Sequence, residues 1–181
     1  MSVTPVASVA RPGSCPVALI AAVRRAARRG TDWEHTANLV AGVLRESLPG
    51  ENLLTAEQLC GDPTCYQTHL VHAEPDGSFS IAAMVWLPGQ QTPVHDHVTW
   101  CVTGVIKGTE YEEIFAWRDG SLEVVARRQN APGTVSGFAP PGDIHRVRNS
   151  GSGVAVSMHV YGADLTRLGS SIRREYALPA G

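Results

Sequence analysis

The chain has a single lysine, Lys107, among its 181 residues, and charge of neither sign accumulates along it. Its 15 Lys and Arg residues stand against 17 Asp and Glu residues, which gives a formal net charge of −2. Proteins that bind nucleic acids or anionic membranes carry basic patches or stripes. The sequence therefore gives no support for binding to nucleic acid or to a membrane surface.

Long apolar runs are also missing, since no stretch approaches the roughly 20 residues needed to span a bilayer. The apolar stretch over residues 17–23 is short and is followed at once by two pairs of arginines. This pattern predicts an amphipathic helix rather than an export signal, so we expect a cytoplasmic protein. In that compartment the four cysteines are expected to stay reduced.

Residues 1–13 are small and contain proline and glycine, which predicts a flexible tail. Helical patterns then cover residues 17–29 and 32–48, and a capping box over residues 54–58 begins a short third helix. We therefore expect a helical segment over residues 14–63 that packs on the remainder of the chain.

From residue 64 onward the chain consists of about eight short segments rich in Val, Ile and aromatic residues, separated by Pro-Gly, Asp-Gly and Gly-Ser-Gly turns. Short strands joined by tight turns are typical of a double-sheet jelly roll or a small barrel. We expect an all-β barrel over residues 64–181, including a C-terminal extension. A chain of 181 residues is long enough for one core, so a single domain is expected overall.

His95 and His97 stand two residues apart, shortly after a Pro-Gly turn. Alternate residues of an extended strand point to the same face, so both imidazoles can reach one ion. An isolated pair at this spacing is usually two surface histidines. The residues around the pair therefore decide between the two interpretations.

Those surroundings resemble the two signature blocks of the cupin superfamily. Residues 89–108 follow the glycine and histidine spacing of the first block, and residues 140–149 follow the second. The resemblance implies a cupin jelly-roll barrel with N-terminal α-helices. It also implies that His95, His97 and His145 bind a transition metal inside the barrel.

Cys101 stands where cupins usually carry a glutamate as a fourth metal ligand. Three neutral imidazoles would leave the positive charge of the ion to anionic ligands, which favours a substrate arriving as a thiolate or carboxylate. Imidazole suits iron, zinc, copper and nickel alike, so the ligand type alone does not select the metal.

Ser157, His159 and Tyr161 alternate and so share one face of a predicted strand, where each can hydrogen-bond to the next. Taken alone, this is the pattern of a half-buried strand with alternating polar residues. Together with the histidine blocks it resembles the Ser-His-Tyr relay of the thiol dioxygenases, the cysteine dioxygenase family, over residues 66–176. The resemblance implies Fe(II) as cofactor and a small thiol and O₂ as partners. It implies oxidation of the thiol to a sulfinic acid, with Ser157, His159 and Tyr161 as catalytic residues.

The same resemblance bears on Cys101. With a one-residue gap, it falls at the position that is bonded covalently to the relay tyrosine in animal cysteine dioxygenases. The resemblance thus implies a thioether between Cys101 and Tyr161. The alternative is a small buried thiol that fills space in the barrel.

A thiol acid needs a group that binds its carboxylate, and the planar fork of arginine suits this. Animal-type enzymes carry that arginine at the place of Thr68, whereas bacterial 3-mercaptopropionate dioxygenases take it from the segment after the relay tyrosine. The second resemblance implies Arg173, then Arg174 and Arg167, as substrate-binding residues, with Gln67 as a further polar contact. It favours a 3-mercaptopropionate-like acid, with L-cysteine as the alternative.

An alternative of another class remains open, a non-catalytic metal-binding cupin that acts as a sensor or binding module. The Ser-His-Tyr strand argues against it, because a binding module needs no proton relay. The chain is expected to act as a monomer or a small homo-oligomer.

Overall fold

The computed structural model describes residues 15–178, so the tail predicted for residues 1–13 lies outside the described part. Helices α1 (Val17–Arg29) and α2 (Trp33–Ser47) agree with the predicted ranges to within one residue at each end. After a 3-10 turn, η1 (Glu51–Leu53), the expected capping box begins α3 (Ala56–Leu59). Across residues 15–178, no helix has both the length and the apolar character needed to cross a membrane.

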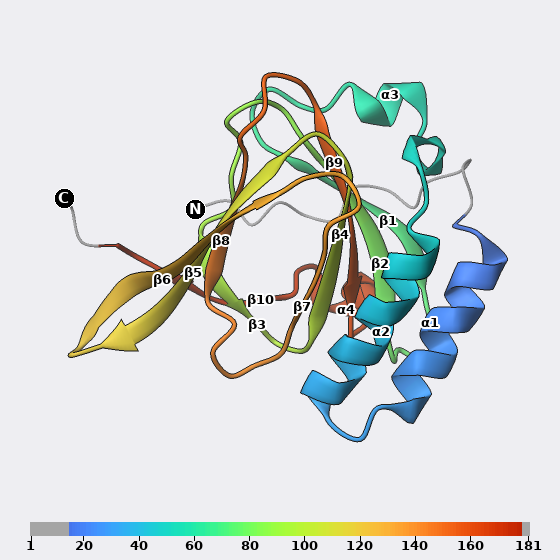
Figure 1. The fold of residues 1–181 in the computed structure, drawn as a ribbon. Coiled ribbons are helices and arrows are strands. Elements are labelled where there is room, and N and C mark those ends of the chain that lie inside the picture. The colour runs from blue at the N-terminus through green and yellow to red at the C-terminus, as the bar shows by residue number, and fades with distance from the viewer. Residues whose placement is uncertain (1–14, 179–181) are drawn as a thin grey trace.

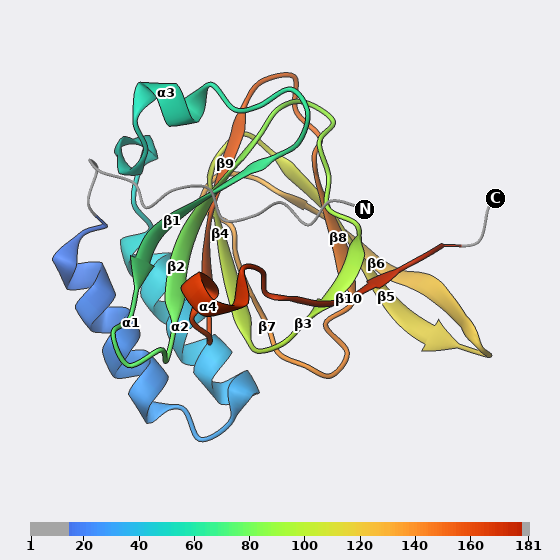
Figure 2. The same ribbon diagram turned by 180° about the vertical axis from the view of Figure 1, so that it is seen from behind.

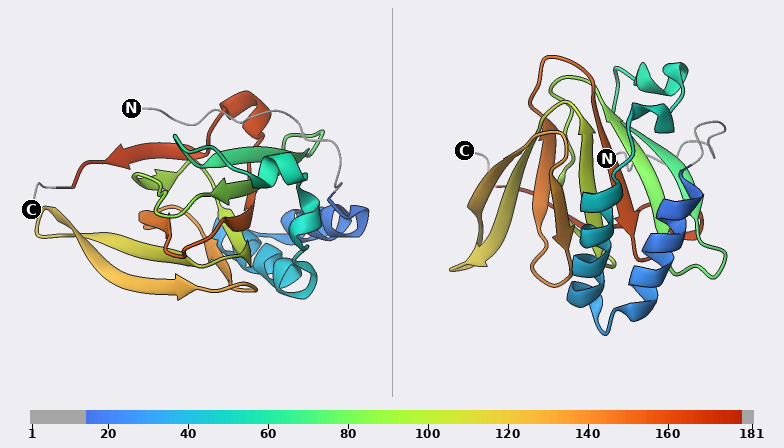
Figure 3. Two further views of the ribbon diagram at one scale, coloured as in Figure 1. Left: turned by 90° about the horizontal axis from the view of Figure 1, so that it is seen from above. Right: turned by 45° about the vertical axis from the view of Figure 1, so that its right-hand side comes forward.

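The strands form two antiparallel sheets of five, which face each other across the interior (Figures 1 and 3). The first sheet has the order β1 (Gln67–Ala73), β2 (Ser80–Trp86), β9 (Ala155–Tyr161), β4 (Cys101–Lys107) and β7 (Val135–Phe138). The second has the order β10 (Ile172–Tyr176), β3 (Val94–His97), β8 (His145–Asn149), β5 (Glu110–Arg118) and β6 (Ser121–Asn130).

Two strands of the second sheet were not among the segments expected from sequence. The His95-Asp96-His97 stretch lies within β3 itself, a strand of four residues, whereas an apolar strand was expected only after it. The polar C-terminal extension forms β10 after a short helix, α4 (Leu165–Leu168), and pairs with β3 at the edge of the sheet (Figure 2). Edge strands are often charged, which explains why hydrophobic patterning did not reveal β10.

Helices α1 and α2 cover the outer side of the first sheet (Figure 1). Their apolar residues, Leu19, Val40 and Leu44 among them, share one buried cluster with Val156, Met158 and Val160 of β9. Residues alternate between the two faces of a strand, so the intervening residues of β9 face the interior between the sheets. All seven residues of β9 are buried, because helices cover one face and the second sheet covers the other.

Candidate metal centre and its pocket

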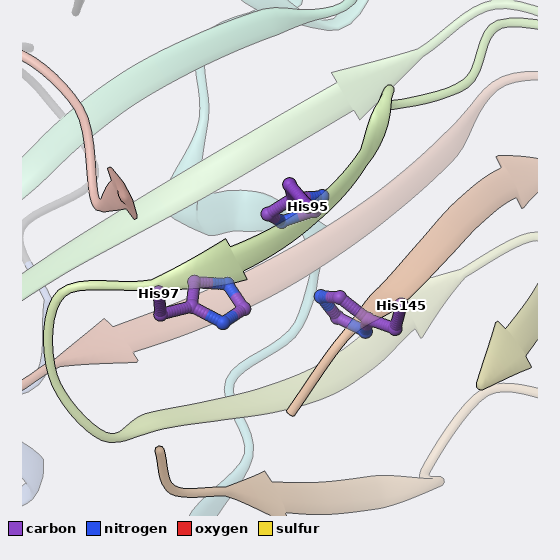
Figure 4. A group of neighbouring side chains, drawn as sticks. All are labelled: His95, His97 and His145. Atoms are coloured by element: carbon purple, nitrogen blue, oxygen red, sulfur yellow. The ribbon is translucent and has the colours of Figure 1, made fainter. Parts of the chain in front are cut away.

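Three histidines from two neighbouring strands of the second sheet converge in the interior. His95 and His97 come from β3, and His145, the first residue of β8, lies opposite His95 in the strand register. One ring nitrogen from each can be chosen so that all three lie within 4.8 Å of one another (Figure 4). All three side chains are buried. His95 and His97 therefore share one face, as their alternation predicted, and His145, which the resemblance to cupins implied, lies beside them.

A hydrogen-bond acceptor lies behind each ring. The Nδ1 atoms are 3.0 Å from the Pro93 carbonyl for His95, 3.0 Å from Asp143 Oδ2 for His97, and 2.8 Å from Glu112 Oε1 for His145. Each acceptor favours the tautomer with its proton on Nδ1, which leaves the Nε2 lone pair for a metal.

Burial favours the neutral form of the two rings on β3. It lowers the pKa of His95 well below its usual range, and the neighbouring histidines lower it further. Burial also lowers the pKa of His97, although the hydrogen bond to Asp143 opposes this. Neutral imidazole is the form that binds metal ions.

The two carboxylates behind the rings are charged. Burial disfavours ionisation of Glu112, but its interactions with His145 and Asn130 together hold its pKa below the usual value. Asp143 is likewise held below its usual pKa, against burial, by His97. Three buried imidazoles whose Nδ1 atoms all face acceptors, two of them carboxylates, form a donor set that fits a divalent transition metal.

Ser157, His159 and Tyr161 form a hydrogen-bonded row along β9, as their alternation predicted. Tyr161 Oη lies 3.0 Å from His159 Nδ1, and His159 Nε2 lies 3.0 Å from Ser157 Oγ. The Trp86 indole N–H donates to the Ser157 hydroxyl at 3.2 Å. Burial lowers the pKa of His159 to about 3, so this ring is neutral near pH 7. Burial raises the pKa of the Tyr161 hydroxyl well above its usual value, which keeps its proton in place.

Cys101 lies opposite Tyr161 in the register of β4 and β9, and both residues are buried. Burial raises the pKa of the Cys101 thiol well above its usual value, while a hydrogen bond with Tyr161 acts in the other direction. Cys101 is not part of the histidine cluster. It adjoins the relay tyrosine instead.

One pocket brings the histidine cluster and the relay together. Its wall contains all three histidines, His159, Tyr161, and the apolar side chains of Met84, Trp86, Val147, Leu165 and Ile172. Its polar remainder consists of Thr68, Thr92 and the segment Gly169–Ser170–Ser171. The Ser171 side chain also hydrogen-bonds to Tyr161.

The arginines expected to bind substrate are engaged elsewhere. Arg173 and Arg174 both donate to Oδ2 of Asp96, at 2.6 and 2.8 Å, and Arg167 pairs with Asp164 on the surface. None of the three lines the pocket within the described part of the chain. The structure therefore does not bring the predicted carboxylate-binding residues to the metal centre, because the buried Asp96 attracts two of them.

Gln67 also lies outside the pocket wall, and its amide donates to the Cys65 carbonyl at 3.4 Å. Its neighbour Thr68 lines the pocket instead. Successive residues of β1 face opposite ways, so only one of the two can face the interior.

Several residues of the site escaped the sequence analysis as functional candidates. Asp143 lies two positions before His145, so the local motif contained it, but nothing marked it as the partner of His97. Glu112 and His145 are 33 positions apart, and only the pairing of β5 with β8 brings them together. Trp86, Ser170 and Ser171 carried no local signal at all.

Comparison with known proteins agrees with the geometry of the site. The family described as "Cysteine dioxygenase type I" matches residues 7–170. Among solved structures, the protein TT1209 from Thermus thermophilus is 21% identical with a TM-score of 0.48, covering 61% of this chain and 95% of that one. A Cupin 2 conserved barrel domain protein from Salinispora arenicola CNS-205 is 22% identical with a TM-score of 0.42, covering 53% and 74%. The family match spans most of the sequence, and the chain therefore belongs to the cysteine dioxygenase type I family, a thiol dioxygenase family of the cupin superfamily.

Proposed function

We propose that this protein is an Fe(II)-dependent dioxygenase that uses O₂ to oxidise a small thiol acid to its sulfinic acid. One observation carries the proposal: the three-histidine cluster and the Tyr161 hydroxyl face the same buried pocket. When bound, Fe(II) supplies the redox chemistry between thiol and O₂ and a positive charge that favours the thiolate. His95, His97 and His145 would hold it.

The protein's own contribution is orientation, proton control and exclusion of water. When His159 carries its hydrogen on Nδ1, the ring donates to the Tyr161 oxygen, and the Tyr161 hydroxyl, which stays protonated, supplies a hydrogen bond to the reacting atoms. Met84, Trp86 and Leu165 form an apolar wall that limits solvent around the thiol. An oriented donor in a dry pocket stabilises developing charge more strongly than water does.

The far end of the substrate would meet hydroxyl groups. The pocket offers Thr68, Ser170 and Ser171 beside Tyr161, and we propose that these donors bind the carboxylate in place of an arginine. A hydrogen bond to a charged group contributes about 1.5–3 kcal/mol, so a few hydroxyls suffice for a small acid. A 3-mercaptopropionate-like acid and L-cysteine both present such a carboxylate.

The test is an oxygen-electrode screen of the Fe(II)-loaded protein with L-cysteine, 3-mercaptopropionate, mercaptosuccinate and cysteamine. We expect uptake of one O₂ per thiol and a sulfinic acid product, identified by mass spectrometry, with the acids faster than cysteamine. Tyr161→Phe should bind iron normally but turn over at least about 10²-fold more slowly, as expected when an oriented proton donor is lost.

Two outcomes would contradict different parts of the proposal. A protein that purifies with zinc and takes up no O₂ with any thiol, even after loading with Fe(II), would exclude the dioxygenase activity. Equal rates with cysteamine and the acids would exclude carboxylate binding while leaving thiol oxidation intact.

A further inference from the structure

Glu110, on β5 of the second sheet, is a buried carboxyl group that the proposed reaction does not use. Glu110 is 2% exposed, and its Oε1 atom has no hydrogen-bond partner within residues 15–178. Its side chain reaches across the interior to the Ser157 hydroxyl of β9, with which it hydrogen-bonds. Ser157 is the relay residue furthest from Tyr161, so Glu110 stands at the inner end of the relay.

The hydrogen bonds of Ser157 couple its two neighbours. The Trp86 indole can only donate, so at 3.2 Å it occupies one acceptor position of the Ser157 oxygen. One acceptor position and one hydrogen then remain, to be divided between His159 and Glu110. If Ser157 donates to one of them, it must accept from the other.

We propose that Glu110 is a positioning residue of the relay, and that its protonation sets the direction in which the hydrogen bonds through Ser157, His159 and Tyr161 run. A protonated Glu110 donates to Ser157, and Ser157 donates to His159 Nε2. The ring then carries its hydrogen on Nδ1 and donates to the Tyr161 oxygen. The Tyr161 hydrogen is then directed away from His159, toward the pocket wall where Met84 Sδ and Ser171 are its neighbours.

An ionised Glu110 exchanges donor and acceptor in every hydrogen bond of the relay. It accepts from Ser157, which accepts from His159 Nε2–H, and His159 Nδ1 accepts the Tyr161 hydrogen. The Tyr161 oxygen then presents lone pairs, not a hydrogen, to the pocket. The hydroxyl above the metal centre is thus a donor in one state and an acceptor in the other.

Switching between the two states moves one proton from Glu110 to the pocket. The number of protons on Ser157, His159 and Tyr161 stays the same. The Glu110 proton passes to the Ser157 oxygen, the Ser157 proton to His159 Nε2, and the His159 Nδ1 proton to the Tyr161 oxygen. Tyr161 gives its own proton to a basic group in the pocket. Glu110 loses one proton and the pocket gains one, and a substrate thiol that ionises can return it by the reverse path.

The surroundings of Glu110 suit this role near neutral pH. Burial raises its pKa to about 7, the hydrogen bond with Ser157 opposes this, and the charge of Glu112 adds to it. Tyr161 also interacts with the charge of Glu110. The register partners of Glu110 on β6 and β8, Asn130 and Asn149, are uncharged. His159 has a pKa of about 3, so it passes the proton by changing tautomer and not by forming a cation.

The experiment observes the tautomer of His159 directly in the metal-free protein, by nitrogen-15 NMR of the histidine side chains. In the wild type we expect the hydrogen on Nδ1 below about pH 6 and on Nε2 above about pH 8, because protonation of one carboxyl controls the switch. Glu110→Gln keeps the size and polarity of the side chain but cannot ionise, so His159 should keep one tautomer throughout. Glu113→Gln, a partly buried carboxylate on the same strand that pairs with Arg146, is the matched control and should switch as the wild type does.

A single His159 tautomer in the wild type at both extremes, or a switch that persists in Glu110→Gln, would overturn the inference. The Fe(II)-loaded enzyme gives a second readout: the ionisation near pH 7 in the turnover profile should disappear in Glu110→Gln and remain in Glu113→Gln. Only this second readout rests on the proposed function. A tautomer switch without thiol oxidation would support the Glu110 relay and count against the proposed activity alone.

Discussion

Cys101 and Tyr161 are the residues whose relationship the fold defines most directly. They lie side by side on β4 and β9, both buried, with the thiol in hydrogen-bonding range of the Tyr161 hydroxyl. We propose that a thioether joins them: the S–H bond of Cys101 and one ring C–H bond of Tyr161 break, a C–S bond forms, and O₂ takes up the two hydrogens and is reduced to hydrogen peroxide. Burial raises the pKa of this thiol, so little thiolate forms and thiolate reactions do not compete with the crosslink.

The prediction is a mass lower by two hydrogen atoms than the sequence requires, after incubation with Fe(II), thiol and O₂. Cys101→Ala should abolish the deficit. Cys15→Ala, which changes another buried cysteine, should retain it. Intact-protein mass spectrometry reads all three proteins, and an unchanged wild-type mass after turnover would exclude the crosslink.

At the scale of residues, the sequence was enough to predict which side chains share one face of a strand. The spacing of His95 with His97, and of Ser157 with His159 and Tyr161, was enough to predict a shared face in each case. It did not reveal contacts between distant segments: Arg173 is 77 positions from the Asp96 that it binds. A cation near the end of the chain therefore looked like a substrate ligand until β10 was seen to pair with β3.

At the scale of elements, β10 pairs with β3, the strand that carries His95 and His97. Asp96, between His95 and His97, is 2% exposed, and its Oδ2 atom accepts hydrogen bonds from Arg173, Arg174 and the Tyr176 hydroxyl. Burial disfavours the charge on Asp96, but these donors together lower its pKa far below the usual range. The C-terminal strand is thereby tied to β3 at the point from which both imidazoles project.

Replacing both Arg173 and Arg174 by alanine should loosen this attachment. A buried carboxylate left without its charged donors costs about 1–3 kcal/mol or more, and the partial exposure of both arginines places the effect toward the lower end. We expect a loss of that order in the free energy of unfolding in urea, together with weaker Fe(II) binding. Arg167→Ala, on an exposed side chain paired only with Asp164, should change stability by less than about 0.5 kcal/mol. Equal stability of the double variant and the wild type would exclude a positioning role for β10.

At the scale of the whole molecule, the site exists because β9 is covered on both faces. Helices α1 and α2 cover its apolar face and the second sheet covers its polar face (Figure 3). His159 and Tyr161 therefore line the same interior pocket as the three-histidine cluster. The helices and most of the strands followed from hydrophobic periodicity and turn residues. The pairing of the strands did not, because strand order depends on contacts between segments far apart in the chain.

The stability of the fold depends on pH because its interior contains buried titratable side chains. His159 has a folded pKa of about 3, against 6.5 as its ordinary value, so it is neutral in the fold and protonated in the unfolded chain at mildly acidic pH. Its contribution to stability is complete above pH 6.5 and is lost as the pH falls from there toward 3. Buried His95 and His97, whose pKa values are also lowered, act in the same direction.

Glu110 acts in the opposite direction. Its folded pKa of about 7 lies above its ordinary value of 4.5, so between these values the folded state binds a proton that the unfolded state does not. Its contribution is therefore largest at low pH and declines as the pH rises toward 7. The metal-free protein should consequently lose stability on acidification from pH 7 to pH 5, by at most about 1.4 kcal/mol per pH unit for each of His95, His97 and His159. Urea unfolding at several pH values measures the slope, which should become shallower in His159→Gln and steeper in Glu110→Gln. A stability that stays flat or rises over this range would mean that the buried histidines are not held neutral by the fold.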